Sequence, residues 1–89
     1  MPKRRYLRLD ENRRSKLEQV LRRDSRPYMR ERASALLQIA DGRSAHWVAR
    51  HGLLHEREPD TVYRWLDAYE ERGIEGLVQL PRRKRDFSP

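Results

Sequence analysis

A stripe of bulky apolar residues at helical spacing limits most strongly what this chain can fold into. Val62, Trp65, Leu66 and Tyr69 recur at the steps of an α-helix and would line one face of a helix over residues 59–72. A glycine follows this stretch directly and is a typical stop signal. Polar and charged residues dominate the other faces, so the sequence predicts an amphipathic helix that buries one side against a core.

Two longer helices are predicted upstream. The first follows Asp10 as its N-cap and carries Leu17, Val20 and Leu21 on one face. The second is capped by Ser25 and has a proline in its first turn, Pro27, where a missing N–H does no harm. Its apolar face comprises Met29, Ala33, Leu36, Leu37 and Ala40, with Ile39 beside it, and its other face carries Arg26, Arg30 and Arg32.

A short helix should precede the amphipathic one. Gly42 ends the preceding helix, Ser44 is a predicted N-cap, and Ala45, Val48 and Ala49 form a narrow face of small residues. Small side chains let another helix cross closely. A short helix, a turn and a longer helix make a helix-turn-helix, in which the last helix is the recognition helix.

The segment "GIEGL" follows the amphipathic helix. It places Ile74 and Leu77 where they can fold back on the core. Because the chain shows no strand pattern, we predict an all-α fold.

Charge indicates the kind of partner. The 89 residues carry 21 Lys and Arg against 14 Asp and Glu, giving a net charge of +7 and a pI near 10.5. This balance fits a polyanion, although general basicity with solvated tails is the alternative. The distribution predicts a basic N-terminal arm over residues 1–9, a helical domain over 10–80 and a basic tail over 81–89.

Two stretches together resemble a known family. "RERASALLQIADGRSAHWVARHG" and "TVYRWLDAYEERGIEGLVQLPRRKR" are similar to the N-terminal DNA-binding region of IS630-type transposases, which are related to the Tc1/mariner group. The matching positions are Arg32, Ala33, Leu36, Leu37, Gly42, Ser44, Val48, Ala49, Thr61, Val62, Trp65, Tyr69, Gly73, Gly76, Leu77, Pro81, Arg82 and Arg85.

The resemblance implies a homeodomain-like trihelical domain that binds the ends of a transposable element, here with an extra N-terminal helix. Three departures from the family pattern stand out. The turn between Ala49 and Val62 is longer, the basic tail lacks the usual glycine, and the chain stops at Pro89, before the family's catalytic domain. We therefore expect DNA binding without catalysis.

The first half of the recognition helix supplies the candidate base contacts. Acidic residues gather near the end of this helix, at Asp67, Glu70 and Glu71, with Glu75 just beyond it. The three within the helix would meet phosphates if it lay flat along DNA, so we expect end-on entry. The residues that would then face the bases are Asp60, Thr61, Tyr63 and Arg64.

Each of these four side chains has its own expected partner. The fork of Arg64 suits guanine O6 and N7. Thr61 suits a thymine methyl or a phosphate, and Tyr63 a phosphate oxygen. Asp60 either accepts from cytosine N4 or caps its own helix, and we favour the cap.

Backbone contacts are expected from the short helix and from both arms. Arg43, Ser44 and Arg50 are the candidates around the short helix, where N-terminal N–H groups attract phosphate. Ser44 can serve as a plain N-cap at the same time. The arm candidates are Lys3, Arg4, Arg5, Arg82, Arg83, Lys84 and Arg85, which would contact phosphates or a narrow minor groove.

Several chemistries are not expected. Cysteine is absent, which excludes disulfides and thiolate chemistry. His46, His51 and His55 could suggest a metal site, but Gly52 interrupts any helical face shared by His51 and His55 and no cysteine assists, so we predict no metal. No Ser/His/Asp set has a persuasive context and the chain is short for an enclosed active site, so we also predict no catalytic residue, no cofactor and no small-molecule substrate. No apolar run reaches the length of a membrane span and no signal peptide is recognised, so we expect a cytoplasmic, nucleoid-associated protein.

Double-stranded DNA is thus the predicted partner, with a homodimer or a transposase subunit open as protein partners. Two rival interpretations remain. The chain is a fragment of a transposase whose catalytic domain lies downstream, or it is a small interaction module. The second expects Trp47 and the Leu53–Leu54 turn to form an exposed apolar patch.

Overall fold

The computed structural model describes residues 6–80. Helices account for most of this segment and no strand occurs within it, which confirms the all-α prediction. The elements are α1 (Glu11–Arg23), α2 (Pro27–Ala40), α3 (Ala45–Trp47), the π-helical turn η1 (Val48–Gly52), α4 (Pro59–Arg72) and α5 (Ile74–Val78). None of the helices in these residues is long and apolar enough to cross a membrane.

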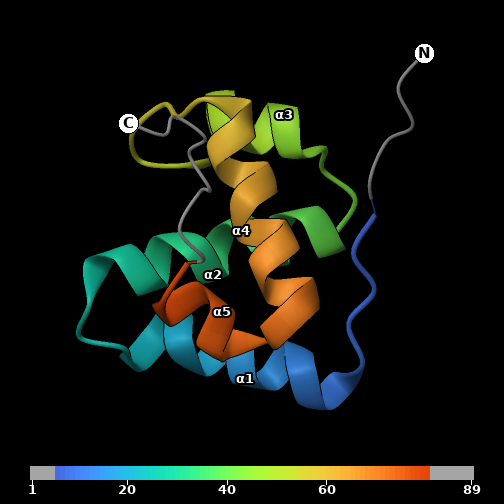
Figure 1. The fold of residues 1–89 in the computed structure, drawn as a ribbon, viewed down its shortest axis with the longest axis vertical. Helices are drawn as coiled ribbons and strands as arrows, with labels where there is room; N and C mark the ends of the chain where they lie inside the picture. The colour runs from blue at the N-terminus through green and yellow to red at the C-terminus, as the bar shows by residue number, and fades with distance from the viewer. Residues whose placement is uncertain (1–5, 81–89) are drawn as a thin grey trace, which may run out of the picture.

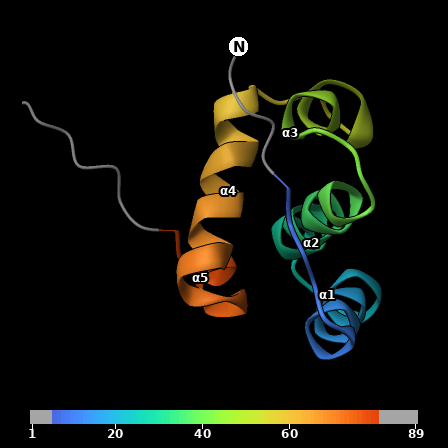
Figure 2. The ribbon, with the colours of Figure 1, turned by 90° about the vertical axis from the view of Figure 1, so that its right-hand side faces the viewer.

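The helices form two sides of a small bundle. α1 and α2 make an antiparallel pair, and α4 crosses in front of them (Figure 1). A view from the side shows α1, α2 and α3 on one side of α4 while its opposite flank faces outward (Figure 2). The recognition helix is therefore packed along one face, as its apolar stripe predicts.

Local side-chain chemistry sets where the first two helices begin. The Oδ1 atom of Asp10 accepts from the backbone N–H of Arg13 at 2.7 Å, which confirms this N-cap. The predicted cap at Ser25 is wrong, because Arg26 holds the N-cap position of α2 without a side-chain cap bond. Asp24 takes over instead: its carboxylate accepts the backbone N–H of Arg26 at 2.8 Å and also binds the guanidinium.

Glycines end two of the helices with positive φ angles. Gly42 has φ of 109° after α2, and Gly73 has φ of 68° after α4. Side chains disfavour this region of backbone space, so glycine stops both helices as predicted. Beyond Gly73 the chain turns directly into α5, a helix that the sequence analysis did not foresee, and Leu77 of α5 is fully buried.

The core joins all the helices. Its largest fully buried side chains are Leu17, Met29, Leu36, Ile39, Val48, Val62, Leu66 and Leu77. Trp65 and Tyr69 are also buried, at 4% and 7% exposure. The predicted apolar stripe of α4 is confirmed in full.

The predicted stripe of α1 is only partly correct. Leu17 is fully buried and Val20 is half-buried, but Leu21 is 39% exposed. The main neighbour of α1 is α2, so its packed face is narrow. Leu21 therefore lies at the edge of a groove instead of in the core.

The segment before α1 joins the core as well. Residues 6–9 of the predicted arm have no helical structure, yet Leu7 is only 8% exposed and belongs to the core cluster. The arm residues Lys3, Arg4 and Arg5 lie outside the described part of the chain.

Candidate nucleic-acid interface

The recognition helix α4 presents one charged row to the outside. Asp60, Arg64, Asp67 and Glu71 are all exposed and follow one another at helical spacing, opposite the buried Val62 and Tyr69. Figure 2 shows a flank of α4 that faces away from α1, α2 and α3, and the exposure of all four side chains is consistent with a position there. Any partner that meets α4 from this side meets these four side chains.

The four predicted base-reading residues divide into two pairs. Asp60 and Arg64 are exposed, whereas Thr61 and Tyr63 are half-buried, and Tyr63 packs against the core. The two exposed side chains are therefore the ones that reach furthest outward. The two half-buried ones line the flanks of the row.

The favoured role of Asp60 as a helix cap is wrong. Pro59 is the first residue of α4, so Glu58 holds the N-cap position, without a side-chain cap bond. Asp60 lies inside the first turn, where its negative charge interacts favourably with the helix dipole. Its carboxylate stays at the surface.

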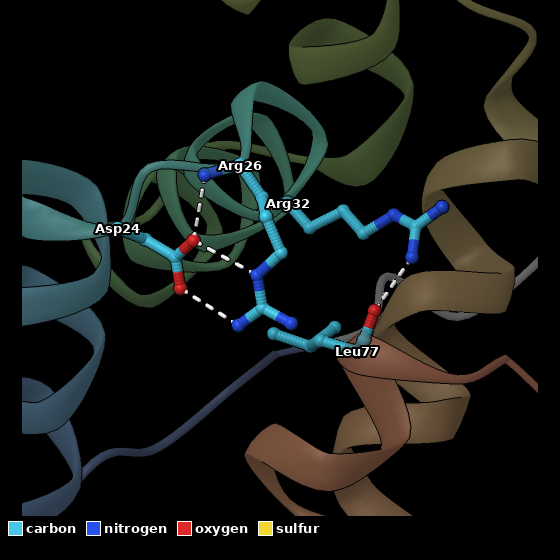
Figure 3. Close-up of polar contacts among 4 residues, drawn as sticks. All are labelled: Asp24, Arg26, Arg32 and Leu77. Atoms are coloured by element: carbon cyan, nitrogen blue, oxygen red, sulfur yellow. Dashed lines mark hydrogen bonds and ion pairs between the residues drawn. The ribbon is translucent and has the colours of Figure 1, made fainter.

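Arg32 of α2 fixes the neighbourhood of Arg64. Its guanidinium donates to the carbonyl oxygen of Leu77 at 2.5 Å (Figure 3). The same guanidinium lies 5.7 Å from the Trp65 ring centroid. Burial lowers the pKa of Arg32, and the positive charges of Arg64 and Arg57 lower it further. Arg64 thus lies near a second cation that is held in place.

Sequence reasoning assigned Arg32 to an outer face, and that placement is incorrect. The side chain is half-buried between α2 and α5, while Arg26 at the start of α2 folds back onto Asp24 (Figure 3). The partner of Arg32 is a carbonyl 45 residues away in the chain. Neither helical periodicity nor a local motif signals such a contact.

The C-terminal half of α4 is shielded on one side by α5. Ala68 is 1% exposed, and a Cβ added to Gly76 would lie 2.8 Å from its carbonyl carbon. The two backbones therefore touch at this point. On the first half of α4, Arg64 is exposed.

The start of α3 combines a cap with a stacked arginine. The Oγ atom of Ser44 accepts from the backbone N–H of Trp47 at 3.0 Å, which confirms the cap. The guanidinium of Arg43 lies 4.1 Å from the centroid of the half-buried Trp47 ring, and the His51 ring lies on the same indole at 5.7 Å. Arg43 is itself exposed, so its donors face solvent from a supported position.

The short helix predicted around Ala49 is not α-helical throughout. Its first part is the α-helix α3, and its second part, residues 48–52, is the π-helical turn η1. The carbonyls at this end bond outside the helix, because Gly52 accepts from the Gln38 amide at 2.7 Å and Ala49 from the Arg57 N–H at 2.8 Å.

The long turn between η1 and α4 is held by two ion pairs. Arg57 binds Glu31 of α2 through two nitrogens, at 2.8 and 2.9 Å. Arg50 donates to Glu56 at 2.6 Å, across the turn itself. The predicted phosphate contact Arg50 is thus exposed but already paired with a carboxylate.

An apolar groove of about 490 Å³ lies beside the same turn, away from Trp47. Leu21, Tyr28 and Leu53 line it, and Leu54 stands 93% exposed at its rim. The apolar patch that the interaction-module hypothesis expects is present in part. Trp47 does not belong to it, because Arg43 and His51 cover its ring.

The three histidines do not converge. Among residues 6–80 no group of three or more His, Asp or Glu could hold a metal ion. The predicted tail contacts Arg82, Arg83, Lys84 and Arg85 lie outside the described residues, so they have no structural account.

Comparison with known proteins gives one match. A family model described as a helix-turn-helix domain matches residues 31–85, which is more than half of the chain. The match begins within α2 and runs through α5, and it includes the charged row and the cap of α3. It implies DNA binding. No curated protein and no solved structure matches the chain.

Proposed function

The chain belongs to this helix-turn-helix domain family, and on that premise we propose that it binds double-stranded DNA in a sequence-specific manner through the first half of α4. Helices in this position enter the major groove with their N-terminal residues against base edges. The observation that carries the proposal is Arg64, which is exposed on the uncovered face of α4 and has no partner among residues 6–80.

The charges along α4 favour entry by this end. Asp67 and Glu71 continue the outward row toward the C-terminus, where α5 also covers one flank. Carboxylates held near phosphates are repelled, so a helix lying flat in the groove is disfavoured. Entry by the first half brings Arg64 to the bases and leaves Glu71 outside.

Backbone contacts would come from the start of α3. Arg43 is exposed and supported by the Trp47 ring, and it lies directly before the Ser44 cap. A phosphate bound there would accept hydrogen bonds from the guanidinium and would be attracted by the partial positive charge of the helix N-terminus. The basic residues of both arms would add contacts that carry no sequence information.

The finer role proposed is recognition of a transposon end, or a regulatory function derived from it. It rests on the resemblance of the two quoted stretches to IS630-type transposases and on the helix-turn-helix match. In this role the domain itself carries out no catalysis. In the alternative, the chain is part of a transposase, and a reading frame that continues into a catalytic domain would favour that alternative. The protein would then lie on the nucleoid, with a second copy or a transposase subunit as its protein partner.

The test compares two variants on the same face of α4. Duplexes selected from a random pool provide a preferred site, and each variant is titrated against that site and a scrambled duplex. We expect Arg64→Ala to lose about 1–3 kcal/mol on the preferred site and far less on the scrambled one. Arg64→Lys should recover only part, because a point charge does not replace a fork.

Glu71→Ala is the matched control at the far end of the row. We expect little change in its base preference and a modest gain in general affinity. Equal losses on both duplexes for Arg64→Ala would reduce this residue to a phosphate contact. A loss of specificity confined to Glu71→Ala would mean that α4 enters by its other end.

A second candidate function is supported by the groove beside Leu54. A leucine that is 93% exposed next to Leu21 and Tyr28 is typical of a protein contact. An interaction module would lose its partner on Leu54→Ser while keeping DNA affinity. Loss of DNA affinity in that variant would assign the groove to the DNA-binding domain instead.

A further inference from the structure

Asp60 and Arg64 are opposite charges that do not pair. An acidic residue four positions before a basic one on a helix commonly forms an ion pair. Arg14, Arg26, Arg50 and Arg57 all bind carboxylates in this structure. Within residues 6–80, however, no hydrogen bond or ion pair engages either Asp60 or Arg64.

The surroundings keep both side chains turned outward. The guanidinium of Arg32 is fixed against Leu77 and Trp65, and its charge disfavours a retreat of Arg64 onto α2. Asp60 makes no cap bond that would turn it back onto the helix end. One acceptor and one forked donor thus stand side by side on the uncovered face of α4.

We propose that Asp60 and Arg64 act together as a reader of a cytosine and a guanine in the major groove, which makes a G·C-containing duplex the preferred ligand. This inference rests on the proposed function, since it requires the first half of α4 to enter the groove. The Arg64 fork donates to guanine O6 and N7, and the Asp60 carboxylate accepts from cytosine N4.

The spacing fixes how close the two bases are. Four residues of α-helix rise about 6 Å, and one base-pair step rises about 3.4 Å. The two side chains therefore reach two different base pairs, one or two steps apart. The preferred site contains its C and its G at this short separation.

Asp60 also rejects the other bases. Guanine and thymine present only acceptors to the major groove, and adenine places an acceptor beside its amino group. A carboxylate is repelled by an acceptor, so cytosine suits Asp60 best. The residue thereby adds discrimination against wrong sites as well as attraction to the right one.

The first experiment selects duplexes from a random pool at a fixed physiological salt concentration, with wild type and Asp60→Asn. Wild type should enrich a C and a G that belong to separate base pairs one or two steps apart. Asparagine pairs with adenine N6 and N7, so Asp60→Asn should exchange the C for an A and leave the G in place. Glu71→Gln removes another exposed carboxylate of the same row and should leave the base profile unchanged.

The second experiment tests the arginine. Replacing the selected guanine by 7-deazaguanine removes one of its two acceptors and should weaken wild-type binding about tenfold. Arg64→Ala should bind the modified and unmodified duplexes equally.

Three results distinguish a failure of the paired base reading from a failure of the proposed DNA-binding function. If Asp60→Asn strengthens binding to all duplexes without changing the base profile, Asp60 is only a repulsive charge and the paired reading is wrong. If wild type binds duplexes but is indifferent to 7-deazaguanine, Arg64 does not read guanine N7. If wild type fails to bind any duplex at low salt, the DNA-binding function itself is refuted.

Discussion

Replacing Gly76 by alanine should separate α5 from α4. A Cβ at this position would lie 2.8 Å from the carbonyl carbon of Ala68 and closer still to its oxygen. Carbon atoms pack at about 3.5–4.0 Å, so the α5 backbone must retreat by roughly 0.7 Å or more. The atoms it meets belong to backbone, which cannot rotate away as a side chain does.

The expected loss follows from what that retreat disturbs. Overpacking costs about 1–3 kcal/mol, and the fully buried Leu77 moves with α5. The bond from Arg32 to the Leu77 carbonyl is also stretched. Alanine returns up to about 1 kcal/mol through its higher helix propensity. We expect a net loss of about 2 kcal/mol, or roughly 8–16 °C in melting temperature for a domain of this size.

Thermal unfolding followed by circular dichroism measures the effect, with two controls. Glu75→Ala changes an exposed residue of the same helix and should stay within about 0.5 kcal/mol of wild type. Gly42→Ala has open space but a positive φ, so it shows the cost of backbone strain alone. A Gly76→Ala variant as stable as wild type, or more stable, would show that α5 can move away from α4 at little cost.

The remaining predictions concern the core, the arms and two ion pairs. Trp65→Ala empties a buried aromatic site and should cost about 3–5 kcal/mol, so an unchanged melting temperature would contradict its burial. Removing residues 1–5 and 82–89 should weaken binding to all duplexes. The slope of log K against log salt concentration should become shallower by about five units, whereas an unchanged slope would exclude phosphate contacts by the arms. Glu56→Gln releases its arginine partner and should strengthen binding to every duplex, with a steeper salt slope; weaker binding would mean that the ion pair positions the turn for DNA. The guanidinium bound to Asp24 lowers the pKa of its carboxyl from 3.8 to about 2, so its stabilisation is complete above about pH 5 and is lost as the pH falls toward 2. Asp24→Asn should remove that part of the acid dependence, and an unaltered acid titration curve would refute it.

The helix positions could be predicted because they depend on local chemistry. The cap at Asp10, the cap at Ser44 and the glycine stops at Gly42 and Gly73 each act within a few residues. The stripe of α4 was equally visible, since periodicity records which face is buried. The cap at Ser25 was misread because Asp24 offers the stronger acceptor to the same turn.

Contacts between distant segments could not be predicted. The bond from Arg32 to Leu77 and the close approach of Gly76 to Ala68 join residues that no local pattern connects. The same holds for the pairing of Arg57 with Glu31, which fixes the long turn. Such contacts appear only when the chain is folded.

These distant contacts matter because they decide which part of α4 is available. The sequence shows carboxylates near the C-terminal end of the helix. Their repulsion by DNA phosphates predicts that this end stays out of the groove. In the folded chain α5 also covers α4 at Ala68, while Arg64 remains exposed. Charge and steric cover thus act in the same direction although they come from different segments. A variant that removes only the charges, such as Glu71→Ala, should therefore leave the orientation on DNA unchanged, because the cover by α5 remains.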